Sequence, residues 1–166
     1  CMEHLPQIEN KIFPDFESFR ALLDSWRGEG AAIVFTNGCF DLLHRGHVEY
    51  LARAAAKGDH LVVGLNSDQS VTRLKGAGRP LIDQYSRALM LSALQFVSAV
   101  VIFEDDTPLS LIEAILPEFL IKGNDYAPEE IAGNEAVVAY GAKVETIGLV
   151  PGFSTTLLIE KIRNLK

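Results

Sequence analysis

The sequence predicts an α/β fold, a single domain built on a doubly wound parallel sheet of five strands. Short, nearly continuous apolar runs recur along the chain, and longer amphipathic stretches at helical spacing separate them. Strands that alternate with helices pair in parallel through right-handed crossovers. The length of 166 residues fits one domain of ordinary size, and a hydrophobic content of 48% fits a buried core.

The predicted elements follow a polar lead-in segment, residues 1–30. In it, Asp15 is placed to cap a helix with apolar side chains at helical spacing, and Gly28 and Gly30 end that helix. The domain proper is predicted over residues 31–166. Its strands are predicted over 31–36, 60–65, 99–103, 119–121 and 143–149. Its helices are predicted over 48–57, 86–96, 108–116, 128–140 and 155–165. Such sheets bind ligands beyond the carboxyl ends of their strands, so the residues after each run are the candidates for chemistry.

The charge balance excludes several classes of partner. Fifteen Lys and Arg stand against 22 Asp and Glu, which gives a net charge of −7. This balance disfavours broad binding to nucleic acid or to an anionic membrane. No apolar run approaches the roughly 18–20 residues that span a bilayer. With Cys1 set aside because it precedes Met2, Cys39 cannot form a disulfide framework, so we expect a cytoplasmic protein.

The segment after the first apolar run carries the strongest candidate site. Residues 36–47 read T-N-G-C-F-D-L-L-H-R-G-H. His44 and His47 are three residues apart at a helix start, so both can face one site. Two imidazoles beside a helix N-terminus suit a developing negative charge on phosphorus, and Gly46 lets a phosphate or base approach the backbone. A metal pair is an alternative, but no further ligand stands at zinc spacing. The missing G-x-G-x-x-G pattern argues against a dehydrogenase.

Further candidates follow other predicted strands. Ser154-Thr155-Thr156 opens the last helix, where hydroxyls taken on their own are most often helix caps. A glycine-bearing basic loop covers residues 72–80, and its Lys75 and Arg79 could close over phosphates, whereas Arg73 fits a solvated loop equally well.

Residues 40–47 resemble the H-x-G-H signature of the nucleotidyltransferase superfamily, which includes cytidylyltransferases and phosphopantetheine adenylyltransferase. The chain from Val34 onward is similar to the heptose 1-phosphate adenylyltransferases, and this branch fits a Rossmann-like sheet. The resemblance runs through residues 106–108, 116–117, 122–126, 128–133 and 154–156. Asn124 departs from the glycine that this branch carries there. Leu149 stands where related cytidylyltransferases carry an arginine, which favours ATP over CTP.

The resemblance implies transfer of AMP from ATP to heptose 1-phosphate, giving ADP-heptose and pyrophosphate. Mg²⁺ would bridge the nucleotide phosphates without protein ligands. The implied catalytic residues are His44, His47, Lys75 and Arg87. The implied nucleotide-binding residues are Phe40, Gly46, Lys122, Gly123, Asp125, Ser154, Thr155 and Thr156. The implied residues for the acceptor sugar 1-phosphate are Asn37, Asp41, Asp68, Arg79 and Tyr126, of which Asp41 could instead orient a loop or a histidine.

Two other functions stay open on the sequence alone. One is a cytidylyltransferase acting on glycerol 3-phosphate or a similar alcohol phosphate. The other is a regulatory module that binds a nucleotide without turnover. Because 166 residues leave no room for a sugar kinase, we expect a separate heptose 7-phosphate kinase to serve the same pathway. Apolar residues within the first thirty positions are compatible with a homodimer.

Overall fold

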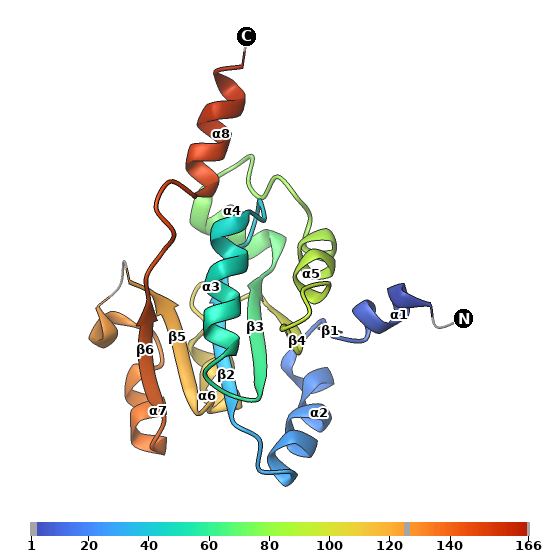
Figure 1. Ribbon diagram of the computed structural model, residues 1–166, viewed down its shortest axis with the longest axis vertical. Coiled ribbons are helices and arrows are strands. Elements are labelled where there is room, and N and C mark those ends of the chain that lie inside the picture. The colour runs from blue at the N-terminus through green and yellow to red at the C-terminus, as the bar shows by residue number, and fades with distance from the viewer. Residues whose placement is uncertain (1–2, 125–126, 166) are drawn as a thin grey trace.

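The computed structural model describes residues 3–124 and 127–165, and within them six parallel strands form one sheet (Figure 1). The strands lie side by side in the order β1-β4-β3-β2-β5-β6. Their bounds are β1 Ile12–Phe13, β2 Ile33–Gly38, β3 His60–Asn66, β4 Ala99–Phe103, β5 Phe119–Gly123 and β6 Lys143–Ile147. The prediction of a parallel α/β sheet is confirmed, whereas the count of five strands is wrong.

Helices cover both faces of the sheet, as a doubly wound fold requires. They are α1 His4–Glu9, α2 Phe16–Gly28, α3 Arg45–Ala55, α4 Asp68–Lys75, α5 Gln84–Ser92, α6 Leu109–Ile115, the 3₁₀ turn η1 Pro128–Glu130, α7 Asn134–Tyr140 and α8 Thr155–Arg163. One core cluster joins α2, α6 and α7 to the sheet, and a second joins α3 and α5 to the other face. Side chains alternate between faces along β2: Phe35 lies in the first cluster and Val34 in the second.

The sixth strand comes from the lead-in segment. Ile12 and Phe13 pair in parallel with Val100 and Val101 of β4. Two residues are too few to produce an alternating pattern, which is why the sequence did not reveal this strand. Asp15 caps α2 as predicted, since its carboxylate accepts the Ser18 N–H at 2.8 Å. Residues on both sides of position 30 thus contribute to one sheet.

The order of the strands places the switch point at β2. From β2 the sheet continues through β3 on one side and through β5 on the other. Loops that leave β2 and its neighbours therefore open a crevice at their carboxyl ends.

Part of the predicted basic loop is helical: α4 runs to Lys75, so the loop proper is confined to residues 76–80. Among the described helices, none is both long and apolar enough to cross a membrane.

Candidate active site

Two histidines stack on each other where α3 begins. His44 occupies the N-cap position, and its side chain does not cap the helix. The rings of His44 and His47 lie 3.8 Å apart between centroids, with an angle of 19° between their planes. Phe40 packs edge-on against His47 at 5.1 Å and holds the pair from one side. The three-residue spacing at the helix start therefore brings both imidazoles into one site.

Buried polar atoms without partners gather at this end of β2 and the first turn of α3. In the part of the chain that the structure describes, six buried side-chain nitrogens and oxygens lack a hydrogen bond. Four of them belong to this region: Nδ1 and Nε2 of His44, Nδ1 of His47, and Oδ1 of Asn37. An unpaired buried polar group costs about 1–3 kcal/mol, and native proteins keep few of them. Such a concentration indicates that a ligand supplies the missing partners.

Both imidazoles are neutral at neutral pH. Burial first, and a charge on His44 second, lower the pKa of His47 to about 4, and a hydrogen bond to the backbone of Leu42 acts in the opposite direction. Burial also lowers the pKa of His44. A neutral imidazole still has one N–H to donate, and an arriving polyanion would favour its protonation. The pair is suited to meet negative charge that the ligand brings.

The start of α8 lies against the start of α3. The Phe153 ring lies 6.4 Å from the His44 ring, and the guanidinium of Arg45 lies 5.4 Å from the Phe153 centroid. A Cβ on Gly46 would come within 3.0 Å of both the His44 ring and the Phe153 Cβ. The glycine is therefore required for packing between these neighbours, rather than only for close approach of a ligand. Ser154 caps α8 by accepting the Leu157 N–H at 3.1 Å.

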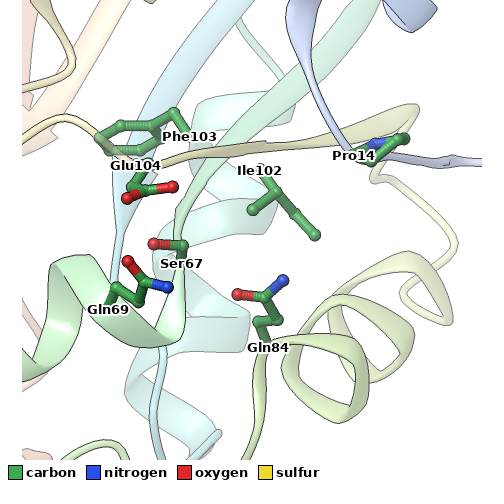
Figure 2. A pocket seen from close by; sticks show the side chains of 7 residues that line it. All are labelled: Pro14, Ser67, Gln69, Gln84, Ile102, Phe103 and Glu104. Atoms are coloured by element: carbon green, nitrogen blue, oxygen red, sulfur yellow. The ribbon is translucent and has the colours of Figure 1, made fainter.

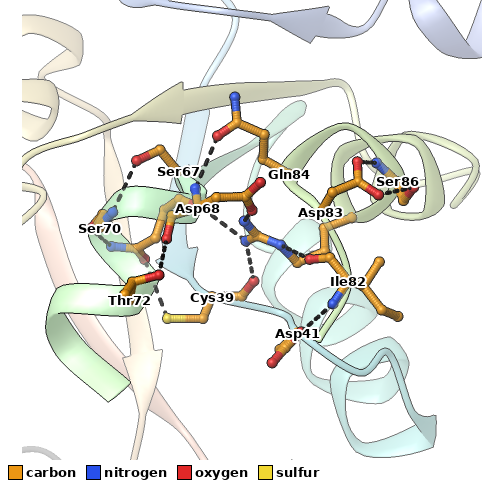
Figure 3. Close-up of polar contacts among 12 residues, drawn as sticks. Cys39, Asp41, Ser67, Asp68, Ser70, Thr72, Ile82, Asp83, Gln84 and Ser86 are labelled. Atoms are coloured by element: carbon orange, nitrogen blue, oxygen red, sulfur yellow. Dashed lines mark hydrogen bonds and ion pairs between the residues drawn. The ribbon is translucent and has the colours of Figure 1, made fainter. Parts of the chain in front are cut away.

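Arg87 joins three segments beside this site. Its partners Cys39, Asp68 and Ile82 lie close together in Figure 3. Its side chain is completely buried. It donates to the carbonyls of Ile82 at 2.9 Å, Cys39 at 2.7 Å and Asn66 at 2.8 Å, and to the Asp68 carboxylate at 2.7 Å. Arginine has five N–H donors, so protein atoms already occupy most of them. Arg87 thereby fixes the loop after β2 to the end of β3.

Asp41 ties the histidine loop to the basic loop. Its buried carboxylate accepts the backbone N–H groups of Leu81 at 2.7 Å and Ile82 at 3.0 Å, and it also pairs with the guanidinium of Arg79. Of the two roles considered for Asp41, this geometry favours orientation of a loop. Lys75 stands exposed in the last turn of α4.

The remaining predicted residues separate into three groups. Lys122 and Gly123 end β5, beside β2 in the sheet. Thr155 and Thr156 form the first turn of α8. Asp125 and Tyr126 lie outside the described residues.

Sequence reasoning missed some of the residues that shape the site. Phe153 is one of them. Its aromatic ring, inside the Ser-Thr turn, was the signal that could have identified it. Arg73, for which the sequence favours a solvated loop and a phosphate contact equally, pairs with Asp106 at 2.8 Å. The amides of Leu81 and Ile82 left no signal, because backbone donors carry no residue identity.

Carboxylates at this edge are a poor match for a dedicated metal cage. Asp41 is occupied by Arg79 and two amides, and Asp68 is paired with Arg87. Within residues 3–124 and 127–165, no group of three or more His, Cys, Asp or Glu side chains is arranged to hold a metal ion. Mg²⁺ commonly enters such sites on substrate phosphates, with few protein ligands, and that mode suits these residues.

The fold and site define a Rossmann-like α/β protein with a cluster of unpartnered buried polar groups at the switch point. The chain belongs to the cytidylyltransferase-like family, which matches residues 35–161. It is 54% identical over 158 residues to the "Bifunctional protein HldE" of Geotalea uraniireducens, covering 95% of this chain and 32% of that protein. The HldE of Syntrophotalea carbinolica is 54% identical over 146 residues, which cover 88% of this chain and 30% of the relative. The chain thus spans about a third of the length of these relatives.

Solved structures share the fold. A lipopolysaccharide core biosynthesis protein from Thermoplasma volcanium is 26% identical, with a TM-score of 0.60 over 73% of this chain and 98% of that one. A pantoate–β-alanine ligase from Francisella tularensis superimposes with a TM-score of 0.58 at 12% identity, covering 92% of this chain and 76% of the ligase. At that identity the ligase supports the fold alone.

Proposed function

We propose that this chain transfers AMP from ATP to heptose 1-phosphate, giving ADP-heptose and pyrophosphate. The observation that carries the proposal is the stacked pair His44 and His47, both neutral and both with unpartnered buried nitrogens. The HldE relatives and the lipopolysaccharide core protein support a role in the supply of an activated heptose. The specific reaction is part of the proposal.

The reaction requires positioning and charge stabilisation rather than proton transfer. A phosphate oxygen of the sugar phosphate attacks the α-phosphorus of ATP and forms the new P–O bond. The bond from the α-phosphorus to the bridging oxygen breaks in line, and its electron pair leaves with pyrophosphate. Because the nucleophile is already an anion, no general base is needed. The N–H groups of His44 and His47 would donate to the α-phosphate oxygens, whose charge peaks in the transition state.

Other residues would handle the charge of the triphosphate. The hydroxyls and backbone N–H groups of Ser154, Thr155 and Thr156 would hold the β- and γ-phosphates at the start of α8. Lys75 in the last turn of α4 and Arg79 in the loop that follows would neutralise the leaving group. Mg²⁺ carried on the phosphates would lower their charge further. Arg87 and Asp41 would act by holding the loops in place, since protein atoms occupy their polar groups.

ATP is proposed as the nucleotide because Leu149 replaces the arginine that related cytidylyltransferases carry. Leu149 is half exposed, and its N–H binds the Asn124 side chain at 3.3 Å. A panel of ATP and CTP with heptose 1-phosphate and glycerol 3-phosphate tests this part of the proposal. Turnover of CTP with glycerol 3-phosphate, but not of ATP with heptose 1-phosphate, would replace it with the cytidylyltransferase function.

The central test is pyrophosphate release from ATP and heptose 1-phosphate by the wild type and by His47→Ala. Loss of one such donor is expected to lower kcat by about 10²–10³-fold. His60→Ala is the matched control, because His60 also stacks on an aromatic ring, Trp26 at 4.0 Å, but lies at the amino end of β3. Its kcat should stay within about twofold of the wild type. Equal rates for wild type and His47→Ala would refute the proposed role. Nucleotide binding without any release of pyrophosphate would favour the regulatory module.

A further inference from the structure

A cavity of about 180 Å³ opens at the carboxyl ends of β3 and β4, on the far side of β3 from the histidine pair (Figure 2). It lies at the same edge of the sheet as the proposed site but shares none of the residues assigned to ATP. Residues that line it are Pro14, Ser67, Gln69, Gln84, Ile102, Phe103 and Glu104. Figure 2 shows Ser67 between Glu104 and Gln69, with Gln84 apart from them and beneath Ile102.

The polar groups of this cavity form a mixed set of donors and acceptors. Gln84 accepts the Asp68 N–H through Oε1 at 2.9 Å, which leaves its two Nε2 hydrogens as donors. Ser67 accepts the Ser70 N–H through Oγ at 3.1 Å, which leaves its hydroxyl hydrogen as a donor. Glu104 supplies a carboxylate, which only accepts. Such a set matches hydroxyl groups, since each hydroxyl both donates and accepts.

The lining disfavours a charged ligand. It contains no Lys or Arg, and its one charged group is the Glu104 carboxylate, which lies 4.0 Å from the Arg73 guanidinium outside the lining, so an anion in the cavity would meet a negative charge first. Glu104 is also the single acidic side chain in the lining, too few for a metal ion. Ile102 and Pro14 add an apolar wall of the kind that packs against the C–H groups of a carbohydrate. The ligand class that fits best is a neutral polyhydroxyl group.

Hydrogen bonds connect residues at the cavity to the loop that leads into the histidine pair. The Asp68 N–H binds Gln84, and the Asp68 carboxylate binds Arg87, which in turn holds the Cys39 carbonyl after β2. Adjacent strands lie about 4.8 Å apart, so β4 is roughly 10 Å from β2 across the sheet. That separation is comparable with the reach of a sugar phosphate from its phosphorus to its far hydroxyls.

We propose that this cavity binds the end of the acceptor sugar farthest from its phosphate, while the phosphate lies at the histidine pair. This inference rests on the proposed function and specifies how the acceptor is selected. Pro14 directly follows β1, so the lead-in segment supplies one wall of the cavity through the sixth strand.

The test measures KM and kcat for wild type, Glu104→Gln and Gln69→Leu with heptose 1-phosphate and with mannose 1-phosphate of the same anomeric configuration. Mannose 1-phosphate lacks the seventh carbon, so it is shorter at the end that the cavity is proposed to bind. We expect KM for heptose 1-phosphate to rise about tenfold in each variant, as loss of one well-made hydrogen bond to a ligand does. KM for mannose 1-phosphate should rise less, while kcat and KM for ATP stay within about twofold.

Glu29→Gln is the matched control, since it removes the same charge from an exposed residue at the amino end of β2. Thermal melts of each variant check that it is folded. An active wild type whose KM for heptose 1-phosphate is unchanged in both cavity variants would overturn the cavity assignment alone. A fall in kcat without any rise in KM would overturn it in the same way. A wild type inactive with every sugar 1-phosphate would overturn the proposed function and this assignment together.

Discussion

The two sides of β2 at the carboxyl edge differ in how their polar groups are satisfied. On one side, His44 and His47 at the start of α3 carry buried nitrogens without partners, and Asn37 near the end of β2 carries a buried oxygen without one. On the α4 and α5 side, Arg87 and Asp41 are buried and their charged groups are bound by several protein atoms. Both sides contain buried polar groups, but only one of them has its hydrogen bonds completed by the protein itself.

This difference separates residues that meet a ligand from residues that hold the site. A buried polar group that is fully paired stabilises one arrangement of the backbone, whereas an unpaired one lowers stability until a ligand arrives. The Arg87 and Asp41 network therefore sets the geometry, and the histidine pair provides donors at a cost in stability. Substitutions in the Arg87 and Asp41 network should therefore mainly lower stability. Substitutions of the two histidines should mainly lower activity.

The largest effect on stability is expected for Arg87→Met. The substitution leaves the Cys39, Asn66 and Ile82 carbonyls without their donor and Asp68 without its counter-ion. An unsatisfied buried acceptor typically costs about 1–3 kcal/mol, so the loss of the donor to three carbonyls should cost at least about 3 kcal/mol, which chemical denaturation measures directly. Arg53→Met is the control, because Arg53 is exposed and pairs with Glu49 at 3.5 Å, so its loss should cost under about 1 kcal/mol. Similar small costs for both variants would remove the distinction between the two sides.

For His44→Ala we expect a large loss of activity and a small change in stability. Its kcat for pyrophosphate release should fall by about 10²–10³-fold, because a donor to the α-phosphate is lost. Its free energy of unfolding should stay within about 1 kcal/mol of the wild type, because lost packing against His47 is offset by removal of two unpaired buried nitrogens. Paired kinetic and denaturation measurements check both numbers.

A double variant shows whether the two histidines act as a unit. In His44→Ala/His47→Ala, the loss of kcat should be well below the product of the two single losses, as for residues that stabilise the same charge. Independent, multiplicative losses would instead mean that each ring acts on a different group.

Whether the sequence predicted a structural feature depends on whether that feature leaves a pattern in the residues. The buried strands were predictable because both of their faces are apolar, and the histidine pair because its spacing at a helix start leaves one geometry. The strand Ile12–Phe13 was not, since two residues carry no periodicity and the pairing with β4 is tertiary. Arg87 was predicted as a site residue through the family resemblance, but its burial among backbone carbonyls was not predictable, because carbonyls look the same in every sequence.

The smallest expected effect concerns pH and tests the histidine side without any substrate. The pKa of His47 is lowered to about 4 in the folded protein, chiefly by burial, against an ordinary value of 6.5. Between these two values the unfolded chain binds a proton that the folded chain does not. The free energy of unfolding therefore falls as pH decreases from 7 toward 4.

His47→Gln should flatten this fall, since glutamine does not titrate. The difference between wild type and variant in the interval from about pH 7 to about pH 4.5 should be about 1 kcal/mol, because the His47 ring is only partly removed from solvent. Urea denaturation at both pH values measures it, with the exposed His4→Gln as a control that should follow the wild type. An equal decline in His47→Gln and wild type would mean that the ring is protonated in the folded state. The donor that His47 offers to phosphate would then be a charged imidazolium, and the neutral unsatisfied groups beside β2 would be those of His44 and Asn37.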